Sequence, residues 1–507
     1  MEEIQLTDEQ LRAVTAPPSI VQVVAGPGTG KTRCVTARAI YLLSMSKHSR
    51  ILVLSHTRKA VSEIAKRVSR RISDLSRVKI MTLHGFCMKT ARILGVFNKN
   101  ARLLKNKEKK EFLKKCLEIH PVFQEIDTIE DTIENCKNLL ITPEEAYCLL
   151  PEDLAKIYEI YEREKEKENL FDFEDMLVSV YRKLSSNHKL ADTLRQQFQH
   201  VIIDEAHDMN KAQYEIVRLI QNGSFFTVLD PNQRIYAFRA GGGPLHRIRQ
   251  DYPDSKEFRL TVNFRSGRRI VEATNRLMNT DIKPRPNAPE GKIEILIQTT
   301  WEKQAKEIAR KIIEITKDYP NETVAVLVRT NFQAATIAPV LEDYGIKSNI
   351  NVGRNVAIPS KSGQCFLHKR LWEKALSVLK KLSSPPEPKG NGKIKVTIST
   401  IHKAKGKEWD HVVIPDVVDK LPCCKQEREE EEKRIFYVAT TRPRKTLVLS
   451  AAKECYGQNT NPSRYIVAIP SNRVNVSYST YLFLRIIGNL TPLFREPHYF
   501  YAFFFPI

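Results

Sequence analysis

The chain lacks the cysteine spacing that would indicate a disulfide framework or a structural zinc site. Its nine cysteines include no repeated C-x-x-C pair, and the adjacent Cys423 and Cys424 have no second pair at a spacing suited to zinc. We therefore predict reduced thiols that carry no metal. The sequence also contains no internal repeat of the length found in solenoid proteins.

Targeting and membrane-spanning signals are also lacking. Residues 1–8 are acidic and polar, without the basic start and apolar run of a secretory signal. The apolar segment after Ser471 is interrupted by Arg485 and Asn489, which is too often for it to span a membrane. We therefore predict a soluble intracellular protein without a membrane partner, in the cytoplasm of a prokaryote or the nucleus of a eukaryote. The pattern predicts no role for the tail 471–507.

Positive charge, in contrast, is in excess. Among the 507 residues, 81 are Lys or Arg and 59 are Asp or Glu, which gives a formal net charge of +22. This balance favours a polyanionic partner, although a basic surface kept for solubility would have the same composition. Apolar residues make up 42%, which is enough for packed cores, and the length predicts two or three units.

Short apolar runs that alternate with segments of helical period predict an α/β fold with parallel sheets. The runs expected as buried strands are residues 20–24, 51–54, 201–203, 225–229, 324–328 and 412–414. Long charged segments with helical periodicity, including 101–118 and 154–168, interrupt this pattern. The predicted domains are 1–89 with 190–280, a helical insertion at 90–189, and a second α/β domain at 281–470. That second domain would include a helix at 301–319 and a small insertion near 354–393.

A glycine-rich string follows the first expected strand and opens a segment of helical period, which is the context of a phosphate-binding loop. Its residues are Ala25, Gly26, Pro27, Gly28, Thr29, Gly30, Lys31 and Thr32. The glycines would let backbone N–H groups approach phosphates, and Lys31 would reach the terminal ones. The Thr32 hydroxyl would help to hold Mg²⁺. Ala25 stands where the usual pattern has glycine.

Two acidic residues follow the apolar run 201–203. Asp204 would bind Mg²⁺, and Glu205 would act as the general base for the attacking water. A strand that ends in two acids is common at a sheet edge, so the pair alone is moderate evidence. Combined with the phosphate loop, it predicts an NTPase with ATP and Mg²⁺ as cofactors.

Further strings occur in a fixed order, and together they resemble superfamily 1 DNA helicases of the UvrD/Rep, PcrA-like type over roughly residues 6–470. The strings are Leu-Thr-Asp-Glu-Gln at 6–10, Ser-His-Thr-Arg-Lys-Ala at 55–60, Thr-Leu-His-Gly at 82–85, Asp-Glu-Ala-His-Asp at 204–208, Leu-Asp-Pro-Asn-Gln-Arg-Ile-Tyr-Ala-Phe-Arg at 229–239, Thr-Val-Asn-Phe-Arg at 261–265, Thr-Ile-His-Lys-Ala-Lys-Gly-Lys-Glu-Trp at 400–409, Tyr-Val-Ala-Thr-Thr-Arg at 437–442 and Asn-Pro-Ser-Arg at 461–464. The resemblance implies two RecA-like P-loop NTPase domains, with a helical insertion in the first and a reduced insertion in the second.

The resemblance also implies roles in the nucleotide site. Adenine would be contacted by Gln10 and Phe264, and another part of the nucleotide by Arg33. The residues expected to face the nucleotide from the second domain are Lys405 and Glu408. The set expected to carry catalysis is Lys31, Asp204, Glu205, the γ-phosphate sensor Gln233, and the charge-stabilising Arg265 and Arg442.

Contacts to single-stranded DNA and to single-strand/duplex junctions are implied as well. The residues expected to make them are His56, Arg58, Thr82, His84, Tyr236, Phe238, Arg239 and His402, because aromatic and imidazole faces stack on bases. The chain departs from the family pattern at three positions: His56 replaces Phe, His207 replaces Gln, and Phe238 replaces Trp. The second-domain insertion is also smaller than the family's usual one.

These observations predict an ATP-dependent DNA helicase that translocates 3′-to-5′ on single-stranded DNA and unwinds duplexes in DNA repair or recombination. The direction comes from the resemblance alone. One alternative is a translocase or remodelling ATPase without processive unwinding, which a reduced second insertion would permit. A nucleic-acid-binding module that has lost the motor is a further alternative, although the complete set of catalytic residues argues against it.

Overall fold

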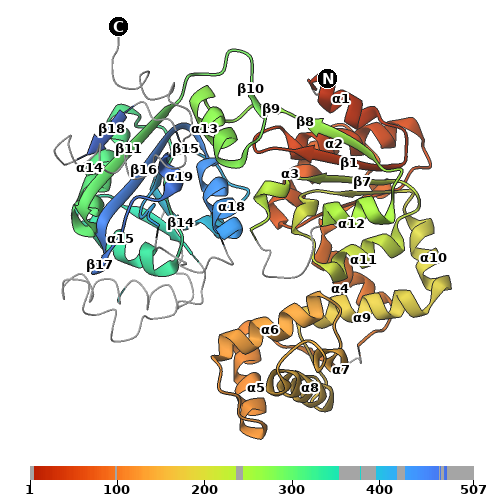
Figure 1. Cartoon of the computed structure of the whole chain (residues 1–507). Helices are drawn as coiled ribbons and strands as arrows, with labels where there is room; N and C mark the ends of the chain where they lie inside the picture. Colours follow the sequence, from red (N-terminus) through yellow and green to blue (C-terminus); the bar gives the residue numbers. More distant parts are fainter. Residues whose placement is uncertain are drawn as a thin grey trace. The chain divides into compact units, whose positions relative to one another are not determined.

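The computed structural model describes residues 5–97, 100–235, 244–352, 396–419, 429–467 and 473–476, together with residues 377 and 469 (Figure 1). The chain separates into two compact units, Met1–Phe264 and Arg265–Ile507. The sequence placed this boundary near residue 280 instead. The difference arises because helix α13 (Arg268–Met278) packs on strand β11 (Lys292–Thr300) and helix α18 (Glu429–Thr440), which belong to the second unit.

Six strands of the first unit form a parallel sheet in the order β3-β2-β6-β7-β1-β8. Their bounds are β1 Ile20–Ala25, β2 Ile51–Ser55, β3 Val78–Thr82, β6 His200–Ile203, β7 Phe225–Leu229 and β8 Lys256–Leu260. The neighbours of β1 are β7 and β8, and β6 lies between β2 and β7. The segments that follow β1, β6 and β7 therefore leave the sheet at the same edge, because the carboxyl ends of parallel strands coincide.

Helices cover both faces of this sheet, which is why its central strands are mainly apolar rather than alternating. One face packs against α1 (Asp8–Thr15), α2 (Lys31–Met45) and α3 (Arg58–Ser69). The other packs against α4 (Leu83–Ile93), α9 (Phe173–Ser186), α10 (His188–Gln197), α11 (Lys211–Ile220) and α12 (Pro244–Asp251). Two separate apolar cores result, one on each side of the sheet.

A helical segment is inserted between β3 and β6 of the first unit. It comprises α5 (Asn106–Ile119), α6 (Ile126–Asn138), α7 (Pro143–Ala146) and α8 (Glu152–Lys167), with a short parallel pair, β4 (Arg102–Leu103) and β5 (Leu170–Phe171). These helices enclose a core of their own, which includes Phe112, Ile133 and Tyr161. The first helix of the insertion therefore begins at Asn106, after a strand, whereas the sequence predicted a helical segment from residue 101.

The second unit contains an eight-stranded sheet in the order β13-β14-β12-β15-β16-β11-β18, with β17 paired to β16. The bounds besides β11 are β12 Val324–Val328, β13 Ser348–Asn351, β14 Val396–Thr400, β15 Trp409–Ile414, β16 Pro443–Cys455, β17 Gln458–Asn459 and β18 Arg473–Val476. All pairs except β16 with β17 are parallel. Helices α14 (Trp301–Asp318) and α15 (Asn331–Asp343) pack on it. Two large parallel sheets confirm the predicted α/β fold.

Two predicted segments lie mainly outside the described residues. The small insertion near 354–393 is described only at residue 377, and the tail 471–507 only at β18. Because β18 pairs in parallel with β11, the second sheet continues past residue 470, where the sequence placed the end of the domain. Among the described helices, none is both long and apolar enough to cross a bilayer.

Candidate nucleotide site

The glycine-rich string forms the turn between β1 and α2 in the first unit. Strand β1 ends at Ala25 and α2 begins at Lys31. Gly28 and Gly30 have φ angles of 71° and 85°, a left-handed conformation that glycine adopts without steric cost. Gly30 is the N-cap of α2 and provides no side-chain acceptor, so the first N–H groups of the helix remain available to an anion.

The Lys31 ammonium lies against the backbone of this loop. Lys31 Nζ donates to the carbonyl oxygens of Gly26, at 3.2 Å, and Ala25, at 3.4 Å. It is also 3.8 Å from a carboxylate oxygen of Asp230, and the Lys31 side chain is only 9% exposed. Its present partners are weak or distant, so a phosphate group that approached the loop would be a stronger partner.

Gln10, on α1, contacts the same loop. Thr7 and Gln10 form a capping box at the start of α1, which fixes the Gln10 side chain. Its Nε2 donates to the Thr29 carbonyl oxygen at 2.9 Å, and a Cβ atom added at Gly30 would lie 2.7 Å from that nitrogen. Arg33, also assigned to the nucleotide, donates to the Gln5 carbonyl oxygen at 3.2 Å.

Asp204 follows the fully buried strand β6 and is itself buried. Burial, and next the Glu205 carboxylate, raise the pKa of Asp204 to about 7, while Lys31 and the nearby Thr32 hydroxyl lower it. Among the described residues, neither carboxylate oxygen of Asp204 has a hydrogen-bond partner of ordinary geometry. A buried carboxylate next to a hydroxyl matches the oxygen ligands that Mg²⁺ prefers, so these residues fit that ion.

Glu205 adopts a backbone conformation that is rare for its residue type. Its φ angle is 53°, in the left-handed region, which costs an amino acid with a side chain about 1–2 kcal/mol. Such strain is typical of functional sites. The Glu205 side chain is 26% exposed whereas Asp204 is buried, so the two carboxylates have different environments. A buried metal ligand beside a solvent-accessible base matches the roles expected for them.

Asp230 connects the end of β7 to the phosphate loop, and sequence reasoning did not single it out. Its Oδ2 accepts from Gln233 Nε2 at 2.6 Å, and its backbone N–H donates to Nδ1 of His207 at 3.1 Å. Burial raises the pKa of Asp230, and Lys31 and Gln233 oppose this shift. Its position directly after the apolar run 225–229 could have identified it. Because β7 pairs in parallel with β1, a residue that follows β7 lies near the loop that follows β1.

The segment after β8 is hydrogen-bonded directly to the phosphate loop. Asn263 Nδ2 donates to the Pro27 carbonyl oxygen at 2.8 Å, and the Phe264 N–H donates to the Gly28 carbonyl oxygen at 2.8 Å. The Phe264 ring remains 37% exposed. The structure therefore brings Phe264 to the loop that also holds Gln10, and it adds Asn263, which the sequence analysis did not identify.

Three of the residues assigned to the nucleotide, Arg265, Glu408 and Arg442, lie close together in the second unit. Arg265 Nε donates to Glu408 Oε2 at 2.6 Å, and Arg444 also pairs with Glu408. Burial opposes the charge of Glu408, but Arg265 and Arg444 outweigh it and lower its pKa. Buried Arg442 donates to the Val438 carbonyl oxygen at 2.8 Å and to the Lys407 carbonyl oxygen at 3.4 Å. Lys405 is half-buried.

Four of the residues expected to contact DNA, His56, Arg58, Thr82 and His84, lie at or just after the ends of β2 and β3 in the first unit. Strands β2 and β3 pair in register, with Ser55 opposite Thr82. His56 and Arg58 follow β2, while Thr82 ends β3 and its hydroxyl accepts from the Gly85 N–H at 3.1 Å. The remaining residues of this assignment are His84, exposed in the first turn of α4, and His402, half-buried in α17 (Ile401–Ala404) of the second unit. Tyr236, Phe238 and Arg239 lie outside the described residues.

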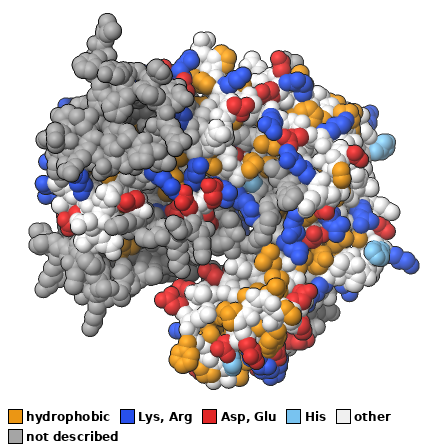
Figure 2. Space-filling view, in the orientation of Figure 1, with side chains coloured by type: hydrophobic (Ala, Val, Ile, Leu, Met, Phe, Trp, Pro, Cys, Tyr) orange, Lys and Arg blue, Asp and Glu red, His pale blue; other side chains and the backbone are white. Residues whose placement is uncertain are grey.

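The excess positive charge is not gathered into one patch on the face seen in Figure 2. Over the described surface of that face, Lys and Arg side chains are interspersed with Asp and Glu. The net charge alone therefore does not locate a nucleic-acid surface, and the assignment depends on the individual residues above.

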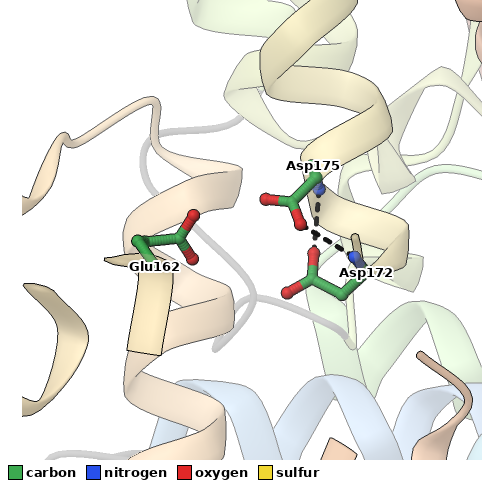
Figure 3. A group of neighbouring side chains, drawn as sticks. All are labelled: Glu162, Asp172 and Asp175. Carbon is green, nitrogen blue, oxygen red and sulfur yellow. Dashed lines mark hydrogen bonds between the residues drawn. The ribbon is translucent and has the colours of Figure 1, made fainter. Parts of the chain in front are cut away.

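Three carboxylates in the helical insertion lie close enough together to resemble a metal site. They are Glu162 on α8 and Asp172 and Asp175 at the start of α9 (Figure 3). Two ammonium groups occupy this position instead. Lys137 Nζ lies 2.7 Å from Asp172 and 2.8 Å from Glu162, and Lys165 Nζ lies 3.0 Å from Glu162. The cluster is therefore a buried ion network that needs no metal.

Comparison with known proteins agrees with this geometry. The model of the UvrD/REP helicase N-terminal domain matches residues 6–253, and the model of the UvrD-like helicase C-terminal domain matches 258–362 and 364–454. A probable DNA helicase II homolog of Mycoplasma genitalium is 30% identical over 302 residues, which are 54% of this chain and 42% of that protein. The ATP-dependent DNA helicase PcrA of Staphylococcus epidermidis is 29% identical over 371 residues, 68% of this chain and 50% of PcrA.

The ATP-dependent DNA helicase Rep of Buchnera aphidicola is 29% identical over 372 residues, which cover 68% of this chain and 57% of Rep. The chain thus spans about half the length of the curated relatives it matches. The two domain models together match most of the chain, in the order of the two compact units. The chain therefore belongs to the UvrD/REP helicase family.

Proposed function

We propose that the chain is an ATP-dependent DNA helicase that translocates 3′-to-5′ on single-stranded DNA and separates strands in DNA repair or recombination. The observation that carries the proposal is the convergence of Lys31, Asp204, Asp230 and Gln233 at one edge of the first sheet. Family membership supports the substrate, because the relatives are named as DNA helicases.

In the proposed hydrolysis, Lys31 exchanges the Ala25 and Gly26 carbonyl oxygens for the terminal phosphates of ATP. Thr32 and Asp204 would hold Mg²⁺, which would neutralise phosphate charge. Glu205 orients the attacking water and accepts its proton, and Gln233 contacts the γ-phosphate. The partial exposure of Glu205 supports this role, because the base must be reached by water.

Recognition of adenine is proposed for Gln10 and Phe264, and a further contact with the nucleotide for Arg33. The contacts of Gln10 with Thr29 and of Phe264 with Gly28 support this, because both place the residue beside the phosphate loop. The exposed Phe264 ring offers a face for stacking on adenine. We also propose that Arg265 and Arg442 stabilise the charge of phosphoryl transfer, with Lys405 and Glu408 contacting the nucleotide.

Single-stranded DNA is proposed to bind at the edge formed by the ends of β2 and β3, through His56, Arg58, Thr82 and His84. The pairing of Ser55 with Thr82 supports this, because it places both segments side by side. His402 is proposed to contact the same strand. For Tyr236, Phe238 and Arg239 the proposal rests on the family pattern alone. Single-strand/duplex junctions are the proposed loading sites.

The experiment that tests the proposal measures ATP hydrolysis with and without single-stranded DNA, with Lys31→Ala as the control variant. Strand displacement is measured in parallel on duplexes with a 3′ or a 5′ tail. We expect DNA-stimulated hydrolysis that requires Lys31, and unwinding that requires a 3′ tail. Stimulation without unwinding would instead indicate a translocase, and unwinding from a 5′ tail would overturn the direction. The absence of Lys31-dependent hydrolysis would refute the motor.

A further inference from the structure

His207 differs from the glutamine that the family carries at this position, and the structure gives it a defined contact. It lies in the short helix η2 (Ala206–Asp208), two residues after Glu205, and its side chain is only 2% exposed. Its Nδ1 accepts a hydrogen bond from the backbone N–H of Asp230 at 3.1 Å, and this bond is buried. The segment that follows β6 is thereby joined to the segment that follows β7 through the His207 imidazole ring.

The hydrogen bond from the Asp230 N–H makes Nδ1 the acceptor of the His207 ring, which has two carboxylates nearby. Nδ1 lies 3.5 Å from Glu205 Oε2, and Nε2 lies 3.8 Å from Asp208 Oδ1. Because Nδ1 accepts from Asp230, the hydrogen of the neutral ring is assigned to Nε2, where an acidic neighbour is present. A side chain in this position needs an acceptor at the δ atom in order to make the same contact.

Asp230 transmits this contact to two residues of the proposed catalytic set. Its Oδ2 accepts from Gln233 Nε2 at 2.6 Å and lies 3.8 Å from Lys31 Nζ. Its Oδ1 accepts from the Asn232 N–H at 3.1 Å, so Asp230 also caps the short turn Pro231–Gln233. A displacement of the Asp230 backbone would therefore move the γ-phosphate sensor, which sits on this turn.

We propose that His207 is a positioning residue for ATP hydrolysis: by holding the Asp230 backbone, it places Gln233, and to a lesser extent Lys31, for γ-phosphate transfer. The inference rests on the proposed function, since it presupposes that the site hydrolyses ATP. His207 needs no contact with the nucleotide for this role. Nucleotide binding should depend on it weakly, because Gln10, Asn263 and the Phe264 backbone hold the loop independently of Asp230.

The test compares His207→Leu, which removes the acceptor but retains much of the volume, with His207→Asn, whose Oδ1 can take the place of Nδ1. We expect His207→Leu to lower kcat for DNA-stimulated ATP hydrolysis about 10- to 100-fold, with less than about 3-fold change in KM, since a buried donor loses its acceptor. His207→Asn should retain kcat within about 3-fold of the wild type. Hydrogen exchange at the Asp230 amide should accelerate only in His207→Leu.

A double-mutant cycle with Gln233→Ala distinguishes positioning from general damage. If His207 acts through Asp230 on Gln233, the combined variant should be little slower than Gln233→Ala alone. If His207→Leu is not obtained folded, His207→Ala takes its place in the same cycle. Multiplicative effects, or a His207→Leu enzyme as fast as the wild type, would overturn the inference while the proposed function stands. A wild-type chain without Lys31-dependent hydrolysis would overturn both.

Discussion

The buried ion network of the helical insertion allows a stability effect to be derived from the structure. Lys137, on α6, is fully buried and lies within 2.8 Å of Glu162, Asp172 and Asp175. Lys165 is the only other cation in direct contact with all three carboxylates among the described residues. Three carboxylates and two ammonium groups give a local charge of −1. The substitution Lys137→Met preserves the length of the side chain and changes this charge to −2.

The expected loss is about 3–5 kcal/mol of unfolding free energy, because removal of one partner leaves buried charge uncompensated. Burial opposes the charge of Lys137, yet the carboxylates raise its pKa well above the ordinary value. Burial likewise opposes the charge of Asp172, but Lys137 and Lys165 hold its pKa well below the ordinary value. That contribution is present at neutral pH and lost as pH falls through the depressed pKa, so the variant's deficit should shrink below about pH 4.

Lys110→Met is the matched control, because Lys110 pairs with Asp127, whose side chain is 60% exposed. A pair of this kind contributes about 0–1 kcal/mol. Urea unfolding gives the global free energy, and hydrogen exchange over residues 106–186 detects unfolding confined to the insertion. If Lys137→Met costs no more than Lys110→Met by both measurements, the network does not stabilise the insertion and the reasoning is wrong.

Two further substitutions probe the candidate nucleotide site. Gly30→Ala should weaken binding of a fluorescent ATP analogue at least about 10-fold, because its φ angle is 85° and the new Cβ would meet Gln10; Gly95→Ala, with open space around it, should bind normally. Asp204→Asn should abolish Mg²⁺-dependent hydrolysis. At pH 8 without metal, however, it should raise the free energy of unfolding by about 1–4 kcal/mol, and the melting temperature should rise with it. The sign follows from a pKa raised to about 7, since the stability from the protonated form is lost as pH rises through that value. A lower melting temperature would contradict this.

Several interior strands could be predicted from the sequence because they are continuous apolar runs, although the interior strands β11, β14 and β16 were not among them. The runs expected at 20–24, 51–54 and 324–328 correspond to β1, β2 and β12 within one residue at either end. The edge strands were not predicted. Strands β8, Lys-Glu-Phe-Arg-Leu, and β13, Ser-Asn-Ile-Asn, carry polar residues because each strand has a neighbour on one side only. Their sequences therefore cannot be distinguished from those of loops.

The contacts of the candidate site were predictable only in part. The phosphate loop and the two acids could be identified because each is a short continuous string at the end of a buried strand. Asn263, in contrast, contacts Pro27 across 236 positions of the chain, and Asp230 meets His207 across 23. Periodicity and local spacing carry no information about such pairs, since the pairing is set by strand order in the sheet. The order β6-β7-β1-β8 is what places Asp230 and Asn263 beside the loop.

This strand order also explains how the loop keeps its shape. Three consecutive carbonyl groups of the loop accept hydrogen bonds from outside it: Pro27 from Asn263, Gly28 from Phe264 and Thr29 from Gln10. The carbonyl side of the loop is thus occupied by groups that follow β8 or begin α1, while the first N–H groups of α2 have no intrahelical acceptor. A loop fixed in this way does not have to be ordered when a phosphate binds, so more of the interaction energy is available for affinity. Because of these contacts, residues far from the phosphate loop in sequence, such as Asn263, should influence nucleotide affinity without touching the nucleotide.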